Sequence, residues 1–489
     1  MYLMGVDIGT SSAKAIVMTI DGEMITEAHQ SYSIQEPEPG YRIQDAEEVL
    51  EAVLHTMKQA LEQLPQTDQI AGICFSAAMH SLMAVDNNGK PLTSLMLWAD
   101  TRSSEQAAQI KKSLAVKELY ESCGVPIHPM TPLCKIMWLR DNEPAIFNKA
   151  FKFISLKEYL FYRFTGEYVI DHSIASATGM LNIHTLQWHG PALQLAGIGP
   201  EKLSAPVSVF KTYTNLPFNL QHRLGLKANV PMIIGGSDGC LANLGSGVAG
   251  EGDVAVTIST SMAVRITCAS PYPDEAQSLF NYVITPGKYV CGGGSNNGSL
   301  LLHWMAQSIL QNKELLDPEL FMKKALTAPA GCDGLIFLPY LLGERAPVWD
   351  AHATGILSGF QFHHEQQHLM RALVEGITMN VFTIIDRLAN VAGKINMIKA
   401  SGGFTHSKEW VQMLADISNL PVMIDNTADA SAMGAVMLAG FSLGFYPSLD
   451  KPMAGKTEKE TFYPHQQANQ VYNKNYQVFK KLYVNNHPA

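Results

Sequence analysis

The fold is decided by residues 4–17, which read MGVDIGTSSAKAIV. Apolar residues lead into Asp7, a turn of small residues follows, and a second β-favouring run continues until the chain breaks at Asp21-Gly22. This pattern predicts a strand, a tight turn and a second strand. Hydroxyls, backbone N–H groups and one carboxylate gather at the tip, which suits a phosphate and its metal ion. An ordinary hairpin whose aspartate caps the turn fits the stretch equally well.

A second stretch echoes the first at an offset of 250 residues, as from Thr10 to Thr260. Residues 256–267 read VTISTSMAVRIT, and Val, Ile, Thr, Ser, Ala and Ile recur in the same places. A repeat near the middle of the chain suggests two related halves. We therefore expect two facing turns, in which Thr10, Ser11 and Thr260 clamp a chain of phosphates.

Length and composition predict a two-domain globular protein. A chain of 489 residues is too long for one ordinary core, and its 47% apolar and 16% charged content is typical of soluble proteins. We expect domains at 1–244 and 245–489, because a glycine-rich link runs from Gly245 to Gly252. The net charge of −9 argues against nucleic acid or an anionic membrane as the main partner.

The cysteines predict a reducing compartment. Seven cysteines are scattered without a CxxC pair, which is typical of a cytoplasmic protein. No signal-like segment precedes the first strand, and no apolar run reaches the roughly 20 residues that span a bilayer. The sequence allows a homodimer and determines neither the oligomeric state nor the regulation.

Strands alternating with capped helices predict α/β sheets, whose ligands lie beyond the strand ends. Asp45 is expected to cap the first helix, and residues 140–230 to form an elaborated region. In the second half we expect strands at 254–259, 262–267, 288–292 and 395–400, with helices at about 299–311 and 366–391.

Several residues at predicted strand ends carry candidate chemistry. Asp7 suits Mg²⁺, directly or through water, because a hard cation prefers carboxylate oxygen. Lys14 can neutralise phosphate charge, although an exposed strand lysine is commoner. Asp238 can take the proton of an attacking hydroxyl during phosphoryl transfer or simply cap a turn. His80, taken alone, fits an ordinary loop histidine. Glycines that permit close approach by a nucleotide are Gly298, Gly402 and Gly403.

Two motif matches point to other classes of protein. Residues 245–250 fit GxGxxG, but a dinucleotide site needs a strand before it and a helix after it, and here a strand follows. Residues 364–368 fit HExxH, which would suit a zinc hydrolase. This match lies at the polar start of a helix, where exposed side chains are the norm, and Glu375 is poorly spaced for a third ligand.

The whole chain resembles the FGGY family of sugar kinases, within the group that shares the actin and hexokinase fold. Residues 130–142, MTPLCKIMWLRDN, fit the first family signature throughout, and residues 355–375 fit the second closely. The family's phosphate turns are similar to 7–11 and 259–261, and its adenosine loop to 401–403. Where the second turn usually has glycine this chain has Ser259, which puts the backbone approach there in doubt. The resemblance implies two ribonuclease H-like α/β domains with a cleft between them, and ATP as phosphoryl donor.

Within the family, local sequences resemble those of gluconate kinases: SAAMHS at 76–81, WAD at 98–100, GVPIHPM at 124–130 and GSDG at 236–239. By this resemblance Asp238 is the catalytic base, Met79, His80 and Trp98 line the sugar pocket with Asp238, and Gly403 and Ser407 contact the nucleotide. The implied reaction is the ATP- and Mg²⁺-dependent phosphorylation of a sugar acid, D-gluconate to 6-phospho-D-gluconate. Xylulose and glycerol are the alternatives within the family. The substrate carboxylate needs a positive partner, and the candidates are Arg102, Lys135, His80 and His128.

Overall fold

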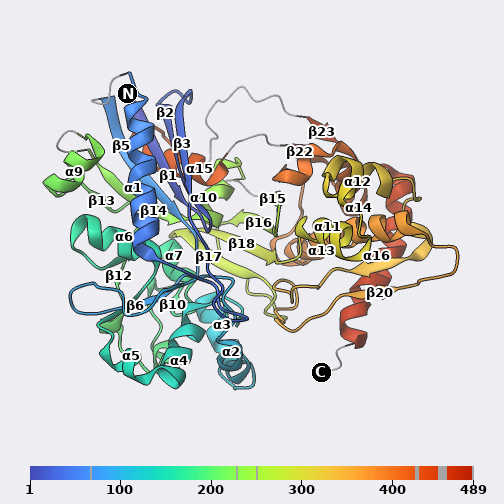
Figure 1. The fold of residues 1–489 in the computed structure, drawn as a ribbon, viewed down its shortest axis with the longest axis horizontal. Helices are drawn as coiled ribbons and strands as arrows, with labels where there is room; N and C mark the ends of the chain where they lie inside the picture. Colours follow the sequence, from blue (N-terminus) through green and yellow to red (C-terminus); the bar gives the residue numbers. More distant parts are fainter. Residues whose placement is uncertain (66–68, 227–229, 249–251, 425–428, 450–459, 487–489) are drawn as a thin grey trace.

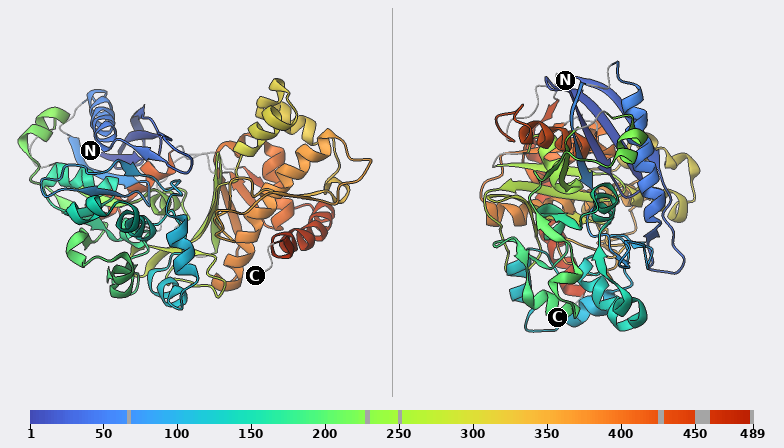
Figure 2. Two further views of the ribbon diagram at one scale, coloured as in Figure 1. Left: turned by 60° about the horizontal axis from the view of Figure 1, so that its bottom comes forward. Right: turned by 90° about the vertical axis from the view of Figure 1, so that its left-hand side faces the viewer.

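The computed structural model describes residues 1–65, 69–226, 230–248, 252–424, 429–449 and 460–486. The chain forms two lobes, each built on one large mixed sheet (Figures 1 and 2). The first lobe runs from blue to green in Figure 1, and the second is mainly yellow to red.

The sheet of the first lobe has the strand order β13-β14-β5-β1-β2-β3. The predicted hairpin is present: β1 pairs antiparallel with β2, and its other edge pairs in parallel with β5, which in turn pairs in parallel with β14. The strands are β1 (Tyr2–Ile8), β2 (Ser12–Thr19), β3 (Met24–Ser31), β5 (Ile70–Ala77), β13 (Thr212–Tyr213) and β14 (Met232–Ser237).

The sheet of the second lobe has the order β17-β18-β16-β15-β21-β22-β23. Its core β18-β16-β15-β21-β22 repeats β3-β2-β1-β5-β14 in both order and strand direction, which confirms two related halves. The strands are β15 (Asp253–Ile258), β16 (Met262–Cys268), β17 (Phe280–Thr285), β18 (Lys288–Ser295), β21 (Met397–Ser401), β22 (Val422–Ile424) and β23 (Thr461–Phe462).

The two repeated hairpins differ at their tips. The first closes with Ile8 opposite Ala13, whereas the second closes with Ile258 opposite Met262, so its turn is one residue shorter. The internal repeat of the sequence therefore corresponds to a repeat of strand order in the two sheets. The turns at the two hairpin tips nevertheless differ in length.

The long helices follow their capping signals. α1 (Ala46–Glu62) begins at Asp45, whose carboxylate accepts from the N–H groups of Glu47 and Glu48. α13 (Gln366–Ala392) matches its predicted span. Residues 104–123 form two short helices, and the helix expected at 299–311 changes to a π-helix after five residues. These and the other second-lobe helices and strands are α2 (Ser104–Lys111), α3 (Val116–Cys123), α11 (Leu300–Trp304), α12 (Pro318–Ala325), β19 (Ile336–Leu338), β20 (Ile356–Ser358), α14 (Lys408–Ser418) and α16 (Gln466–Asn486).

The elaborated region covers one end of the first lobe with short elements. It packs around its own apolar cluster, which includes Leu133, Met137 and Phe153. The elements in and beside it are β4 (Ile43–Gln44), β6 (Met83–Val85), β7 (Leu95–Met96), α4 (Pro132–Asn142), α5 (Pro144–Lys149), β8 (Lys152–Ile154), α6 (Leu156–Thr165), β9 (Val169–Asp171), α7 (His172–Ser176), β10 (Leu181–Asn182), β11 (Gln187–Trp188), α8 (Gly190–Ala196), β12 (Ala205–Val207) and α9 (Phe218–Leu224).

A helix from the C-terminal part of the sequence packs on the sheet of the first lobe. α15 (Ala430–Ser442) belongs to the second half of the sequence, yet it packs on β1 and β5 and against α10 (Asp238–Gly245). The approach is so close that a Cβ on Gly5 would lie 2.2 Å from the carbonyl oxygen of Ala432. The first-lobe sheet is thus completed by a helix from beyond residue 245, and the domain limits at 244 and 245 stay a prediction.

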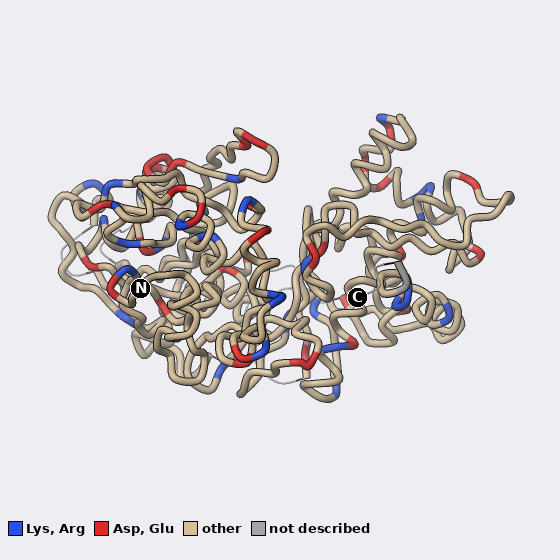
Figure 3. Tube along the Cα trace, turned by 90° about the horizontal axis from the view of Figure 1, so that it is seen from below, with Lys and Arg blue, Asp and Glu red and all other residues tan. Residues whose placement is uncertain are grey.

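Charge and burial agree with the globular protein expected from the composition. Lys and Arg are interspersed with Asp and Glu over both lobes (Figure 3). All seven cysteines are buried and free of disulfide bonds. No helix in the described ranges is long and apolar enough to cross a membrane.

Candidate active site

Asp238 lies where β14 passes into α10. Ser237 caps this helix by accepting from the N–H of Cys240, and the Asp238 carboxylate accepts from the N–H of Gly239 at 2.6 Å. Burial raises the pKa of Asp238, while the Arg265 guanidinium opposes this shift. A Cβ on Gly239 would lie 2.9 Å from Met79 Cε and 3.4 Å from Arg265 Nε, so the loop that bears Met79 and strand β16 meet beside the carboxylate.

Asp7 ends β1 on the same side of the sheet, where Ser76 Oγ donates to its Oδ1 at 2.7 Å. Burial raises the pKa of Asp7 to about 7, and the negative charges of Asp238 and Asp429 add to the shift. Lys14 is not free at this position, because it forms an ion pair with Asp429. Lys14 and Arg265 compensate only part of the negative charge of these carboxylates, and a divalent cation would add to that compensation.

The described residues can bind a magnesium ion only if water and substrate phosphates supply most of its ligands. Nowhere in that part of the chain do three His, Cys, Asp or Glu side chains come close enough to form a complete metal site. Mg²⁺ usually keeps several waters and binds through one or two carboxylates plus substrate phosphates. Asp7 is therefore suited to hold the ion in the manner expected from the sequence.

The two hairpin tips are open to solvent but differ in their contacts. In the first, Thr10 Oγ1 accepts from Trp98 Nε1 at 3.0 Å, and Ser11 is exposed. In the second, Ser259 and Thr260 are exposed. The hydroxyls of these exposed residues are available to an anion, whereas the N–H of Ser259 already donates to the carbonyl of Ser261 at 2.8 Å.

Gly298 and Gly402 pack against the second hairpin. A Cβ on Gly298 would lie 2.4 Å from the carbonyl oxygen of Ser259, and one on Gly402, which has φ of +96°, would lie 2.5 Å from that of Ile258. The protein's own backbone therefore already requires these two glycines, independently of any ligand.

Gly403 and Ser407 line a cavity of about 530 Å³ in the second lobe. A Cβ on Gly403 would meet nothing within 4 Å, so this glycine faces open space. Ser407 caps α14 by accepting from the N–H of Trp410. Leucines and Phe404 form an apolar part of the wall, and a volume in the range of 300–1,000 Å³ is typical of pockets for small molecules.

The sugar-pocket residues expected from the sequence meet side chains of the second lobe. His80 Nε2 lies 3.1 Å from the hydroxyl of Tyr282 on β17. The guanidinium carbon of Arg345 lies 4.9 Å from the centre of a Trp98 ring. Residues from both lobes thus surround the region between Asp238 and Trp98.

None of the four cations considered for a substrate carboxylate is free. Arg102 makes two hydrogen bonds to the Asp100 carboxylate, at 2.9 and 2.7 Å. Lys135 donates to the carbonyls of His80 and Leu97 at 2.6 Å each. Burial lowers the pKa of His80 to about 3, and the pKa of buried His128 also falls well below its usual value. Both imidazoles are therefore neutral at pH 7.

Arg265, Tyr282 and Arg345 complete the site, and nothing in the sequence pattern marks them. Arg265 alternates with apolar residues in a strand, which usually indicates an exposed side chain. Arg345 lies in the loop GERAP at 343–347, outside any periodic segment. The offset of 250 aligns Arg265 with Ala15, so the internal repeat does not reveal it either.

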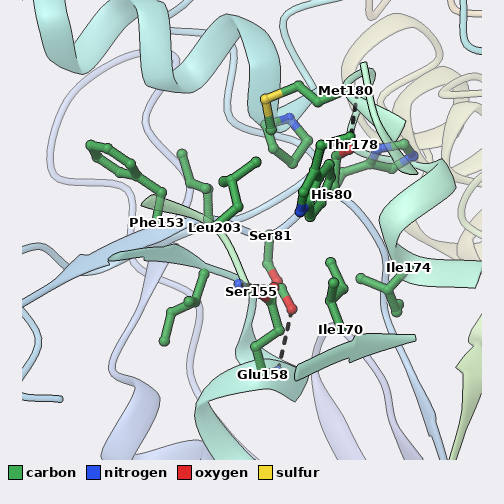
Figure 4. A pocket seen from close by; sticks show the side chains of 14 residues that line it. His80, Ser81, Phe153, Ser155, Glu158, Ile170, Ile174, Thr178, Met180 and Leu203 are labelled. Carbon is green, nitrogen blue, oxygen red and sulfur yellow. Dashed lines mark hydrogen bonds between the residues drawn. The ribbon is translucent and has the colours of Figure 1, made fainter. Parts of the chain in front are cut away.

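A second cavity, beside His80, is too small for a sugar. It measures about 10 Å³, room for about one water molecule. Figure 4 shows His80, Thr178 and Met180 on one side of it and Ser155 and Glu158, joined by a hydrogen bond, below. Most other lining side chains are apolar, so this space belongs to the core.

The HExxH match is a structural feature rather than a zinc site. His364 and His368 are each only 8% exposed, which corrects the expectation of exposed side chains. Each Nδ1 accepts a nearby backbone N–H, from Gln361 and Glu365. Glu375 pairs with Arg371 instead of approaching the histidines. The GxGxxG match reaches residues outside the described ranges; its Gly245 ends α10, and β15 follows, as expected.

Comparison with known proteins identifies the family. Residues 2–245 and 254–443 match the family models for the N-terminal and C-terminal domains of the FGGY family of carbohydrate kinases. The chain is 38% identical to a gluconokinase of Bacillus subtilis over 470 residues, covering 94% of this chain and 91% of that protein. It is 29% identical to a xylulose kinase of Staphylococcus xylosus over 485 residues, covering 99% of each. A solved gluconate kinase from Lactobacillus acidophilus superposes with a TM-score of 0.94 at 30% identity, covering 99% and 98% of the two chains.

The chain therefore belongs to the FGGY family of carbohydrate kinases. It is a phosphotransferase that acts on a small sugar-like molecule with ATP, and it has the two-domain actin and hexokinase-like fold. Both the resemblance and the fold class inferred from the sequence are confirmed.

Proposed function

We propose that this kinase phosphorylates a sugar acid, D-gluconate, to 6-phospho-D-gluconate with ATP and Mg²⁺. The observation that carries the proposal is the cationic site between the lobes, where Arg345 lies against Trp98 and acts on His80, and Arg265 lies beside Asp238. An acid is favoured by a site that presents positive charge. The identity to gluconokinases adds support, and the similar xylulose kinases make xylulose the main competitor.

In this proposal Asp238 is the catalytic base. Its raised pKa and its place beside Arg265 suit a carboxylate that accepts a proton from the attacking hydroxyl as the phosphoryl group arrives. Asp238 also contributes to the sugar pocket, with Met79 nearby. The positive charge of Arg265 opposes the rise that burial causes in the pKa of Asp238, and it can offset charge that develops on the phosphoryl group.

The nucleotide is assigned to the second lobe. The cavity lined by Gly403 and Ser407 would take the adenosine, and the tips that carry Thr10, Ser11 and Thr260 would take the phosphates. Asp7 would hold Mg²⁺, and the ion would offset the negative charge of the phosphates. Lys14 is assigned an indirect part, because it neutralises Asp429 next to Asp7. The cytoplasm, which supplies ATP, is the expected location.

The test is ADP release by the purified protein over a panel of D-gluconate, D-xylulose, D-ribulose and glycerol, with and without Mg²⁺. The proposal expects gluconate to give the highest kcat/KM and no turnover without the metal ion. A higher kcat/KM for xylulose would reassign the substrate within the family. If the enzyme phosphorylated none of the four compounds, gluconate and all of its alternatives in the panel would be excluded as substrates.

A further inference from the structure

Arg345 carries a positive charge that the described part of the protein compensates only in part. In the described ranges no carboxylate forms an ion pair with its side chain, although Glu344 precedes it. The Glu344 carboxylate is fully buried, accepts from Ser295, Asn297 and Asn380, and binds the backbone N–H of Arg345. Burial raises the pKa of Glu344 to about 7, so this group neutralises its neighbour only in part.

The Arg345 guanidinium is held firmly in place. Nη2 donates to the carbonyl of Ser295 at 3.1 Å, and the guanidinium lies over the Trp98 ring. A Cβ on Gly294 would lie 2.9 Å from Nη1, so the glycine in strand β18 makes room for the group. Nε is buried and has no hydrogen-bond partner within the described structure.

A second unpaired donor belongs to the same neighbourhood. His128 Nδ1 accepts from the N–H of Met130 at 3.2 Å, so the ring proton must reside on Nε2. Nε2 is buried and lacks a partner among the described residues. The charge of Arg345 is the largest electrostatic influence on His128 after burial, and it also acts on His80 and Tyr282. Buried donors without partners are costly unless a ligand satisfies them.

We propose that Arg345 binds the carboxylate of the substrate and so selects a sugar acid over a neutral polyol. This inference rests on the proposed function and names the residue that recognises the acid. An arginine fork matches a carboxylate, and the contact with Trp98 and the hydrogen bond to Ser295 hold the guanidinium in position. The charges of Asp238 and Arg345 both act on Tyr282, so the proton acceptor and the carboxylate partner belong to the same neighbourhood.

Calorimetry on the whole protein tests this inference, with D-gluconate and D-glucitol as paired ligands. The two differ at the end of one six-carbon chain, where glucitol carries a hydroxymethyl group. For the unaltered protein we expect tighter binding of gluconate. In Arg345→Met the dissociation constant for gluconate should rise about 10- to 100-fold, with that for glucitol nearly unchanged. Arg345→Lys should retain part of the preference.

Arg223→Met is the matched control, since Arg223 pairs with Glu51 on the surface of the first lobe and should not affect either ligand. If Arg345→Met failed to fold, the binding of both ligands would weaken equally. The preference of Arg345→Lys for gluconate over glucitol would then decide the role of Arg345. If the unaltered protein shows no preference for gluconate, the proposed substrate is wrong. If the unaltered protein prefers gluconate and both Arg345 variants keep the full preference, Arg345 does not bind the substrate carboxylate.

Discussion

Trp98 Nε1 donates a hydrogen bond to Thr10 Oγ1 at 3.0 Å, and the same indole lies beneath the Arg345 guanidinium. One side chain therefore joins the first hairpin tip to the second-lobe arginine. Because Thr10 is assigned to the ATP phosphates and Arg345 to the sugar acid, Trp98 couples the two halves of the proposed site.

Replacement of Trp98 by Phe tests this coupling. The variant keeps an aromatic ring under Arg345 but loses the donor to Thr10, a bond worth about 0.5–1.5 kcal/mol. We expect kcat/KM for ATP to fall roughly 3- to 10-fold, with gluconate binding little changed. Steady-state kinetics would contradict the coupling if ATP parameters were unaltered and only gluconate binding weakened.

Asp238→Asn tests the base. The amide keeps the size of the side chain and can still accept from the Gly239 N–H, so the fold should persist. Loss of a general base typically costs 10²–10⁴ in rate, and we expect kcat to fall within about this range. The thermal unfolding midpoint, which should stay close to that of the unaltered enzyme, serves as the folding control. Turnover within a few-fold of the unaltered enzyme would exclude Asp238 from this role.

Asp7→Asn should stabilise the metal-free protein in a pH-dependent manner. The folded-state pKa of Asp7 is about 7 against an ordinary value of 3.8, so the folded chain binds this proton more tightly than the unfolded chain does. The contribution of Asp7 to the free energy of unfolding therefore falls as pH rises from about 4 to 7. Asn removes this penalty and can still accept from Ser76.

Thermal unfolding in EDTA measures the effect. The midpoint of the variant should exceed that of the unaltered protein by several degrees at pH 8 and by little at pH 4. Activity with Mg²⁺ should be lost at both pH values. An equal difference at pH 4 and pH 8 would mean that the Asp7 carboxylate carries no such penalty.

Gly403→Ala separates the nucleotide cavity from the fold. The new methyl group meets no protein atom within 4 Å, so the unfolding midpoint should hardly change, whereas KM for ATP should rise about tenfold if adenosine lies against this backbone. Gly434→Ala is the contrasting case, because its methyl group would lie 1.9 Å from the Leu241 carbonyl between α15 and α10. That variant should lower the unfolding midpoint markedly without a selective effect on ATP.

Regular elements and turn chemistry were predictable from the sequence. The apolar spacing of α13 predicts 366–391, close to the observed Gln366–Ala392, because its buried face repeats at helical intervals. The paired hairpins follow from the repeat. The burial of His364 and His368 did not, since both rings bind backbone groups that only the folded chain brings near.

The charged half of the site was not predictable for the same reason. The signals in the sequence mark Asp7 and Asp238, which end strands of the first lobe. Arg265 and Arg345 belong to the second lobe, and only the folded chain brings them to Asp238 and Trp98 of the first lobe. These partners are distant from the two arginines in sequence. The apparent candidates Arg102 and Lys135 were misleading because each is already bound within the first lobe, Arg102 to the Asp100 carboxylate and Lys135 to the carbonyls of His80 and Leu97.

The most direct test of the account is a competition. The purified enzyme, Mg²⁺ and limiting ATP are mixed with equal concentrations of D-gluconate and D-xylulose, and the phosphorylated products are quantified by mass spectrometry. The product ratio equals the ratio of kcat/KM values. We predict 6-phosphogluconate in large excess, about tenfold or more if one charged contact distinguishes the substrates. An excess of xylulose phosphate would contradict the assignment of a sugar acid to this site.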